Sequence, residues 1–82
     1  MTRALELPSI VRLHRKKAGL SQKQLADLAG VGKTAVFDLE KGKESVQMDT
    51  VRKILRVLNI RMSFASPLLD AMRTQEEIDA LR

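Results

Sequence analysis

The spacing of apolar residues predicts four helices in the first 60 residues of the chain. Apolar positions recur three and four residues apart, which is the period of a helix with one buried face. Proline at the start of the first stretch and glycine after the first three fit helix termini, because proline suits a first turn and glycine takes left-handed conformations readily. The predicted helices span residues 8–18, 21–29, 33–41 and 48–58.

The second and third of these helices are short and closely joined, within the stretch LSQKQLADLAGVGKTAVFDLEKG at residues 20–42. Ser21 is a good N-cap, and Gln24 three residues later completes a capping-box pattern. Gly30 ends the first of the two helices, and Val31 supplies an apolar residue in the turn. Two helices with a glycine-containing turn predict a helix-turn-helix, whose second helix can lie in a DNA major groove.

Residues 60–65, with the sequence IRMSFA, alternate apolar and polar side chains and therefore predict a short strand. One strand in an otherwise helical chain has no partner within that chain, and an unpaired strand edge is usually paired or covered. We therefore expect the strand to pair with its copy across a two-fold axis. The residues expected at this dimer interface are Val57, Ile60, Met62 and Phe64.

The chain changes character at Ser66. Ser66 and Pro67 can start a helix, and Thr74 with Glu77 forms a second capping-box pattern. Segments this short are marginal as isolated helices, so the tail is either helical or disordered. The predicted organisation is a helix-turn-helix domain for DNA binding and dimerisation over residues 1–65, followed by an acidic tail over residues 66–82.

The charges of the chain are unevenly distributed. The net charge is +5. Residues 1–65 hold 13 Lys or Arg against 6 Asp or Glu, whereas residues 66–82 hold 2 against 4. A basic body is the electrostatic footprint of a protein that binds the phosphate backbone of nucleic acids, although it also fits a merely soluble basic surface.

The composition argues against several other classes of protein. With no cysteine and one histidine, the chain offers neither a disulfide framework nor a zinc site, and no catalytic constellation stands out. We therefore expect no enzyme activity, no metal and no cofactor. No apolar run approaches the roughly 18 residues of a membrane span, and the N-terminus lacks a signal-peptide core, which together predict a cytoplasmic protein with no membrane partner.

An ordered set of residues between positions 11 and 60 resembles the Cro/phage-repressor (Xre-type) helix-turn-helix family, and the IRMSF segment makes the chain most similar to HipB-like antitoxins. The resemblance implies an all-α fold: a compact four- to five-helix, lambda-repressor-like DNA-binding domain with one short C-terminal strand that pairs across a dimer. The matching residues are Gly19, Leu20, Ser21, Gln22, Leu25, Ala26, Gly30, Val31, Val36, Leu39, Glu40 and Gly42.

The resemblance and the chemistry of the side chains together indicate which residues meet DNA. Residues at the start of a recognition helix face base edges, where lysine can donate to guanine and threonine can touch a thymine methyl. The expected base contacts are Lys33, Thr34, Ala35, Phe37 and Asp38. The expected phosphate contacts are Ser21, Gln22, Lys23, Lys41 and Lys43.

Five of the polar or aromatic positions leave alternatives open. Phe37 either meets a thymine methyl or packs against a partner, and Asp38 either accepts from cytosine or lies too far from the groove. Arg15 and Glu40 match a charge pair that ties the first helix to the third in this family, although two separate solvated charges would fit the sequence as well. His14 lies on the apolar side of the first helix, and we expect it to be partly buried in preference to a pH switch.

These observations predict a homodimeric repressor that binds a palindromic operator in double-stranded DNA. The resemblance implies that it is the antitoxin of a HipA-kinase-type toxin–antitoxin operon, that it represses its own promoter, and that a HipA-like kinase toxin is its protein partner. One alternative is a stand-alone Xre-type regulator. Another is an interaction module that neutralises a partner protein and binds DNA only incidentally.

Overall fold

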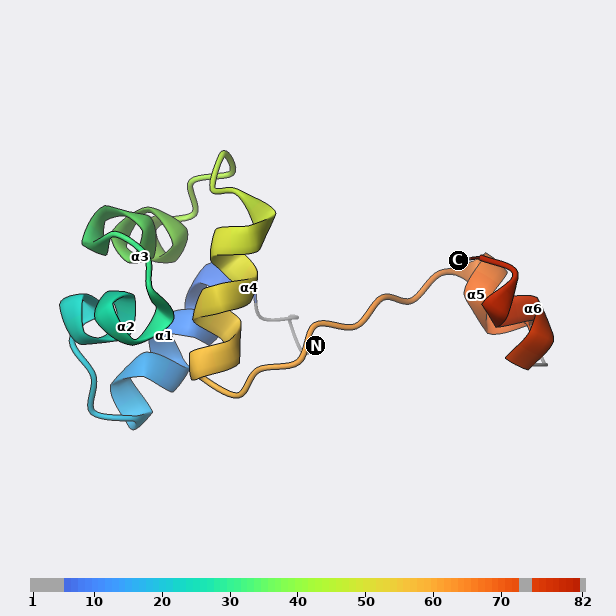
Figure 1. Ribbon diagram of the computed structural model, residues 1–82, viewed down its shortest axis with the longest axis horizontal. Helices are drawn as coiled ribbons and strands as arrows, with labels where there is room; N and C mark the ends of the chain where they lie inside the picture. Colours follow the sequence, from blue (N-terminus) through green and yellow to red (C-terminus); the bar gives the residue numbers. More distant parts are fainter. Residues whose placement is uncertain (1–5, 73–74, 82) are drawn as a thin grey trace, which may run out of the picture.

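A computed structural model describes residues 6–72 and 75–81, and within them the fold is all-α, as the sequence predicts (Figure 1). Four helices form one body, and two short ones lie away from it at the end of an extended segment. The six helices are α1 (Leu7–Lys17), α2 (Gln22–Ala29), α3 (Lys33–Lys41), α4 (Met48–Val57), α5 (Pro67–Ala71) and α6 (Gln75–Asp79).

The helix-turn-helix consists of α2 and α3, and its ends form as the residue types dictate. The Ser21 hydroxyl accepts from the Gln24 amide at 3.0 Å, and the Gln24 side chain accepts from the Ser21 amide at 2.8 Å. This is the reciprocal capping box that the sequence predicts. Gly30 and Gly42 end α2 and α3 with φ of 71° and 89°, a left-handed conformation that side chains rarely adopt.

All four helices of the body contribute to one apolar core. Helix α2 packs against α3 and α4, and α1 packs against α3. Apolar burial of this kind is the main stabilising contribution in a domain of this size. The buried core residues are Val11, Leu25, Ala26, Val36, Leu39, Val51, Ile54 and Leu55.

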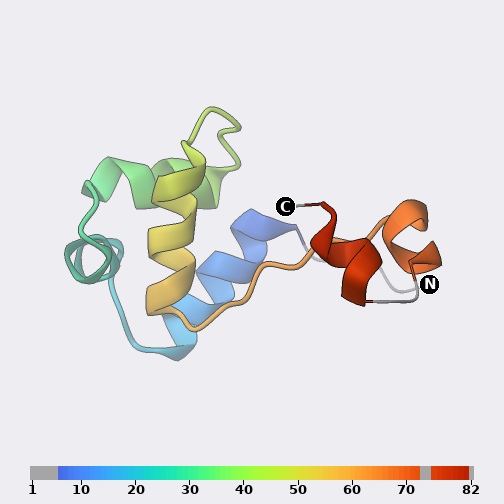
Figure 2. The same ribbon diagram turned by 45° about the vertical axis from the view of Figure 1, so that its right-hand side comes forward.

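The segment between α4 and α5 does not form a strand in the single chain. Ile60 donates its amide to the Leu55 carbonyl at 2.9 Å, which closes the end of α4. Beyond it, the described residues contain no sheet, and residues 61–66 run past the start of α1 (Figure 2). A strand is defined by the hydrogen bonds of its partner, and one copy of the chain supplies no partner. The strand at residues 60–65 therefore stays a prediction about the dimer.

The structure bears on the predictions for His14 and for the second capping box in different ways. The prediction for His14 is wrong for the single chain, because the ring is exposed and its Nδ1 lies 2.7 Å from the Ile10 carbonyl oxygen, one turn back on α1. The ring therefore bonds to its own helix and does not enter the core. The second capping box lies partly outside the described residues, since Thr74 is not among them. None of the described helices is long and apolar enough to cross a bilayer.

Candidate nucleic-acid interface

The first turn of α3 presents its side chains to solvent. Lys33 and Thr34 are exposed, whereas Val36 and Leu39 on the opposite side of the same helix are buried. The N-cap is Gly32, which has no side chain to occupy the first amides of α3. A lysine, a hydroxyl and the positive end of a helix therefore lie together, an arrangement that suits contact with base edges or phosphate oxygens.

The other three expected base contacts differ in their exposure to solvent and in their contacts within the chain. Phe37 is 45% exposed, and the Lys41 ammonium lies 5.1 Å from the centre of its ring. Ala35 is half-buried. The Asp38 carboxylate is half-buried and lies 3.6 Å from the Lys43 ammonium. This ion pair lowers the local negative charge, which would otherwise repel a phosphate backbone.

Several expected phosphate contacts already have partners within the chain. The Ser21 hydroxyl caps α2, and Lys23 pairs with Asp27 at 2.9 Å in a highly exposed ion pair. Gln22 is half-buried and its side-chain amide donates to Glu40 at 3.4 Å. Exposed ion pairs of this kind contribute little stability, so Lys23 is free to exchange its partner for a phosphate.

Arg15 and Glu40 are brought together by the packing of α1 on α3. Arg15 Nε donates to Glu40 Oε2 at 2.6 Å, and a second guanidinium nitrogen donates to Glu40 Oε1 at 2.9 Å. A third guanidinium hydrogen bond, at 2.9 Å, reaches the Leu20 carbonyl in the turn before α2. Only 11% of the Arg15 side chain and 5% of the Glu40 side chain are exposed. The bidentate pair thus links α1, α3 and the start of the helix-turn-helix.

The environment of Glu40 keeps it charged. Burial alone would raise the pKa of Glu40, but hydrogen bonds from Arg15 and Gln22 and the positive charges of Arg15 and Arg12 outweigh burial and lower it. The hydrogen bond to Glu40 likewise raises the pKa of Arg15, against the opposing effect of burial. Both members of the pair are therefore ionised throughout the neutral range.

A hollow of about 240 Å³ opens beside this pair, between α1, α2 and α3. Its walls combine three cationic side chains with a glutamine, a carboxylate and an aromatic ring. Arg12 is the residue in it that the sequence analysis overlooked, although it lies one helical turn before Arg15 and so on a similar face. The residues that line the hollow are Arg12, Arg15, Gln22, Phe37, Glu40 and Lys41.

The residues expected at a dimer interface become more exposed from the end of α4 toward Phe64. Val57 and Ile60 are half-buried and pack on the core of the body, Met62 is 37% exposed, and Phe64 is 74% exposed. The exposure of these four side chains therefore rises from the end of α4 to Phe64, whose ring is open to solvent in the single chain. Among the described residues, no group of His, Asp and Glu is placed to hold a metal ion.

Comparison with known proteins defines the class to which this fold belongs. The helix-turn-helix family model matches residues 11–64 of the chain. The uncharacterized HTH-type transcriptional regulator y4mF of Sinorhizobium fredii is 36% identical over 62 residues, which cover 76% of this chain and 82% of that protein. The HTH-type transcriptional regulator PuuR of Escherichia coli is 34% identical over 55 residues, which cover 65% of this chain but only 30% of PuuR.

Solved structures show the same arrangement of helices. A chain from a HipA-HipB-O2-O3 complex matches with a TM-score of 0.68 at 21% identity, over 82% of this chain and 99% of that one. A chain from a HipB-O4 20mer complex gives 0.66 at 21% identity, over 80% of this chain and 99% of that one. The protein belongs to the helix-turn-helix family and is a DNA-binding transcriptional regulator. The relatives that it matches are described as transcriptional regulators.

The near-complete burial of the Arg15–Glu40 pair predicts a large effect of breaking it. Glu40→Gln should lower the free energy of unfolding at neutral pH by about 3–5 kcal/mol, because the Arg15 charge is left without its counter-charge. The double variant Arg15→Met with Glu40→Leu should recover much of that loss, since an apolar pair needs no counter-charge. Chemical denaturation of the unaltered protein, Arg15→Met, Glu40→Leu and the double variant measures the coupling, and strictly additive losses would contradict the pair.

The lowered pKa of Glu40 gives the same pair a defined pH dependence. Its stabilisation is complete above the pKa of an unfolded glutamate and is lost as the pH falls through the lower folded pKa. Acid unfolding of Glu40→Gln should therefore lack this component, whereas Glu44→Gln, at an exposed loop position, should retain it.

Proposed function

We propose that this regulator is a homodimeric repressor that binds a palindromic operator and serves as the antitoxin of a HipA-kinase-type operon. The observation that carries the DNA-binding part is the exposed first turn of α3, where Lys33 and Thr34 stand on a helix whose other face is buried. The similarity in fold to chains from the HipA-HipB-O2-O3 complex and the HipB-O4 20mer complex supports the proposal that the protein is an antitoxin.

In this proposal α3 reads bases and its surroundings hold the backbone. Lys33 donates to guanine O6 or N7, Thr34 contacts a neighbouring base, and Phe37 meets a thymine methyl from the next turn of α3. Asp38 accepts from a cytosine amino group where Lys43 screens its charge, and Ala35 permits close approach of the helix to the bases. Phosphates are held by the start of α2 and by the lysines around α3: Ser21, Gln22, Lys23, Lys41 and Lys43.

The proposed domain organisation places DNA binding and dimerisation in one part of the chain and separates the tail from both. Residues 1–65 bind DNA and form the dimer, and residues 66–82 form an acidic tail outside the helical body. Helix-turn-helix repressors commonly place two recognition helices about 34 Å apart, one helical turn of DNA. Pairing of residues 60–65 across a two-fold axis supplies the second recognition helix and covers Met62 and Phe64.

The DNA contacts predict distinct effects of two lysines. Lys33→Ala should weaken binding to a duplex from the protein's own promoter by about 1–3 kcal/mol and relax specificity at one position. Lys41→Ala should weaken binding to all sequences alike and reduce the slope of log K against log salt by about 0.9 for each phosphate that the variant no longer neutralises. Fluorescence anisotropy across a salt series measures both, with Lys53→Ala on α4 as the control. Absence of duplex binding by the unaltered protein at low salt would refute the proposal.

The exposed aromatic predicts how the dimer is disrupted. Burying Phe64 should contribute on the order of 1.5–3 kcal/mol per protomer, at roughly 25 cal/mol per Å² of apolar surface. Phe64→Asp should therefore weaken the dimer and its operator affinity while leaving the helical content intact. Sedimentation at micromolar concentration is the measurement. A monomeric unaltered protein, or a variant that dimerises fully, would show that this segment is not the interface.

The antitoxin part has its own test. We expect a neighbouring gene to encode a kinase-fold protein whose growth inhibition is relieved when this chain is co-expressed, and the two proteins to co-purify. Phe64→Asp should reduce both effects if the dimer is the form that binds the kinase. A stand-alone regulator would repress its promoter without any such partner.

A further inference from the structure

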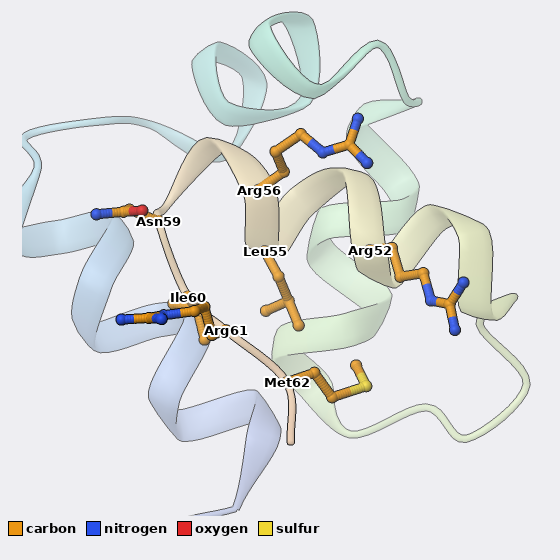
Figure 3. A pocket seen from close by; sticks show the side chains of 7 residues that line it. All are labelled: Arg52, Leu55, Arg56, Asn59, Ile60, Arg61 and Met62. Carbon is orange, nitrogen blue, oxygen red and sulfur yellow. The ribbon is translucent and has the colours of Figure 1, made fainter. Parts of the chain in front are cut away.

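A shallow groove of about 300 Å³ lies along α4 and the segment that follows it (Figure 3). Arg52 and Arg56 project from α4 toward one side, and Arg61 projects from the following segment toward the other. Leu55 and Met62 lie between them, and these two residues with Ile60 supply the apolar part of the lining. We call these six residues the arginine groove.

The arginine groove gathers three positive charges that have no ion-pair partner among the described residues. Three surface lysines lie within 4.0 Å of a carboxylate, in the pairs Lys23–Asp27, Lys43–Asp38 and Lys53–Asp49. In the part of the chain that the structure describes, no carboxylate pairs with any arginine of the groove. Three cations around an apolar lining suit a segment that carries both carboxylates and apolar side chains.

The tail of the chain has that chemistry. Helices α5 and α6 carry exposed carboxylates at Asp70 and Glu76, and they expose large apolar side chains as well. Leu68 is 65% exposed and Ile78 is 43% exposed, so neither is covered by the body of its own chain. Helices of five residues are marginal alone, which means that the tail gains stability from a surface to pack on.

The direction of strand pairing decides which tail reaches which groove. Two copies of residues 60–65 that pair across a two-fold axis run antiparallel, so the end of one strand lies beside the start of the other. The start of each strand is Ile60 and Arg61, at the arginine groove. The tail that begins at Ser66 of one copy therefore emerges beside the groove of its partner, about 16 Å from its own Arg61 at 3.3 Å per residue.

We infer that the acidic tail of each copy docks in the arginine groove of the other copy. Asp70 and Glu76 pair with the groove arginines, and Leu68 and Ile78 cover Leu55, Ile60 and Met62. The inference rests on the proposed dimer and adds to it a second, salt-sensitive contact between the copies. The two carboxylates of the partner's tail then offset two of the three charges of each groove, and the cations around α3 remain as the basic surface that faces DNA.

A charge swap between two full-length chains tests this exchange. One chain carries Arg52→Glu and Arg61→Glu, so its groove and its tail are both acidic. The other carries Asp70→Lys and Glu76→Lys, so its groove and its tail are both basic. Docking between copies matches acidic with basic in both halves of a mixed dimer and mismatches both halves of either homodimer. Native mass spectrometry of the mixture should show a several-fold excess of mixed dimer over the statistical half, which declines in high salt.

The control separates local pairing from general attraction between oppositely altered chains. It replaces the groove variant by Lys16→Glu with Lys53→Glu, which changes the same net charge outside the groove, and it should give nearly statistical mixing. Statistical mixing in both experiments would overturn the inference, as would equal excess in both. Statistical mixing in both experiments is also the result expected if the tail docks on its own chain or if the groove binds a separate acidic protein. A monomeric unaltered protein would instead refute the proposed dimer itself.

Discussion

The placement of α3 is the constraint on which the rest of the structure depends. This nine-residue helix buries Val36 and Leu39 in the core and keeps Lys33 and Thr34 in solvent. A helix this short has little stability of its own, so its orientation comes from the elements around it. Packing against α2 and α1, the left-handed glycines at Gly30 and Gly42, and the pair from Arg15 to Glu40 supply that orientation.

The ionic interactions of the protein divide by burial into two groups with different effects. Arg15 and Glu40 are nearly enclosed and make a bidentate contact, so their role is to hold two helices in one register. The lysine pairs at the surface are exposed to water and exchange readily. DNA binding by release of counterions needs charges of the second group, whereas the geometry of the recognition helix needs the first.

Much of the fold was accessible from the sequence because its signals are local. The capping box at Ser21, the glycine stops and the helical spacing in α4 each depend on residues within one or two turns, and each formed as predicted. The exposure of His14 could not be predicted from local signals, because the spacing of apolar residues along a helix does not show how far the neighbouring helices extend. Arg12 was missed for a similar reason, since the hollow it lines is built from three helices.

The strand at residues 60–65 marks the limit of single-chain reasoning. Its alternation is a property of the sequence, but its hydrogen bonds require a second copy, and the structure of one chain shows only the extended segment. The base contacts are in the same position, since exposure of Lys33, Thr34 and Phe37 is a property of the protein and recognition is a property of the complex. The sequence and the structure thus define which side chains are exposed on α3, and only a complex with DNA defines which bases they contact.

In the proposed mode of binding, the starts of α2 and α3 form the DNA-binding face, and the arginine groove stays away from DNA. The most direct measurement is an NMR titration of the isotope-labelled protein with a duplex from its own promoter. The backbone amides of residues 21–24 and 33–38 should shift most, while those of residues 52–61 should change little. The largest shifts at Arg52, Arg56 and Arg61, with α3 unaffected, would contradict this mode of binding.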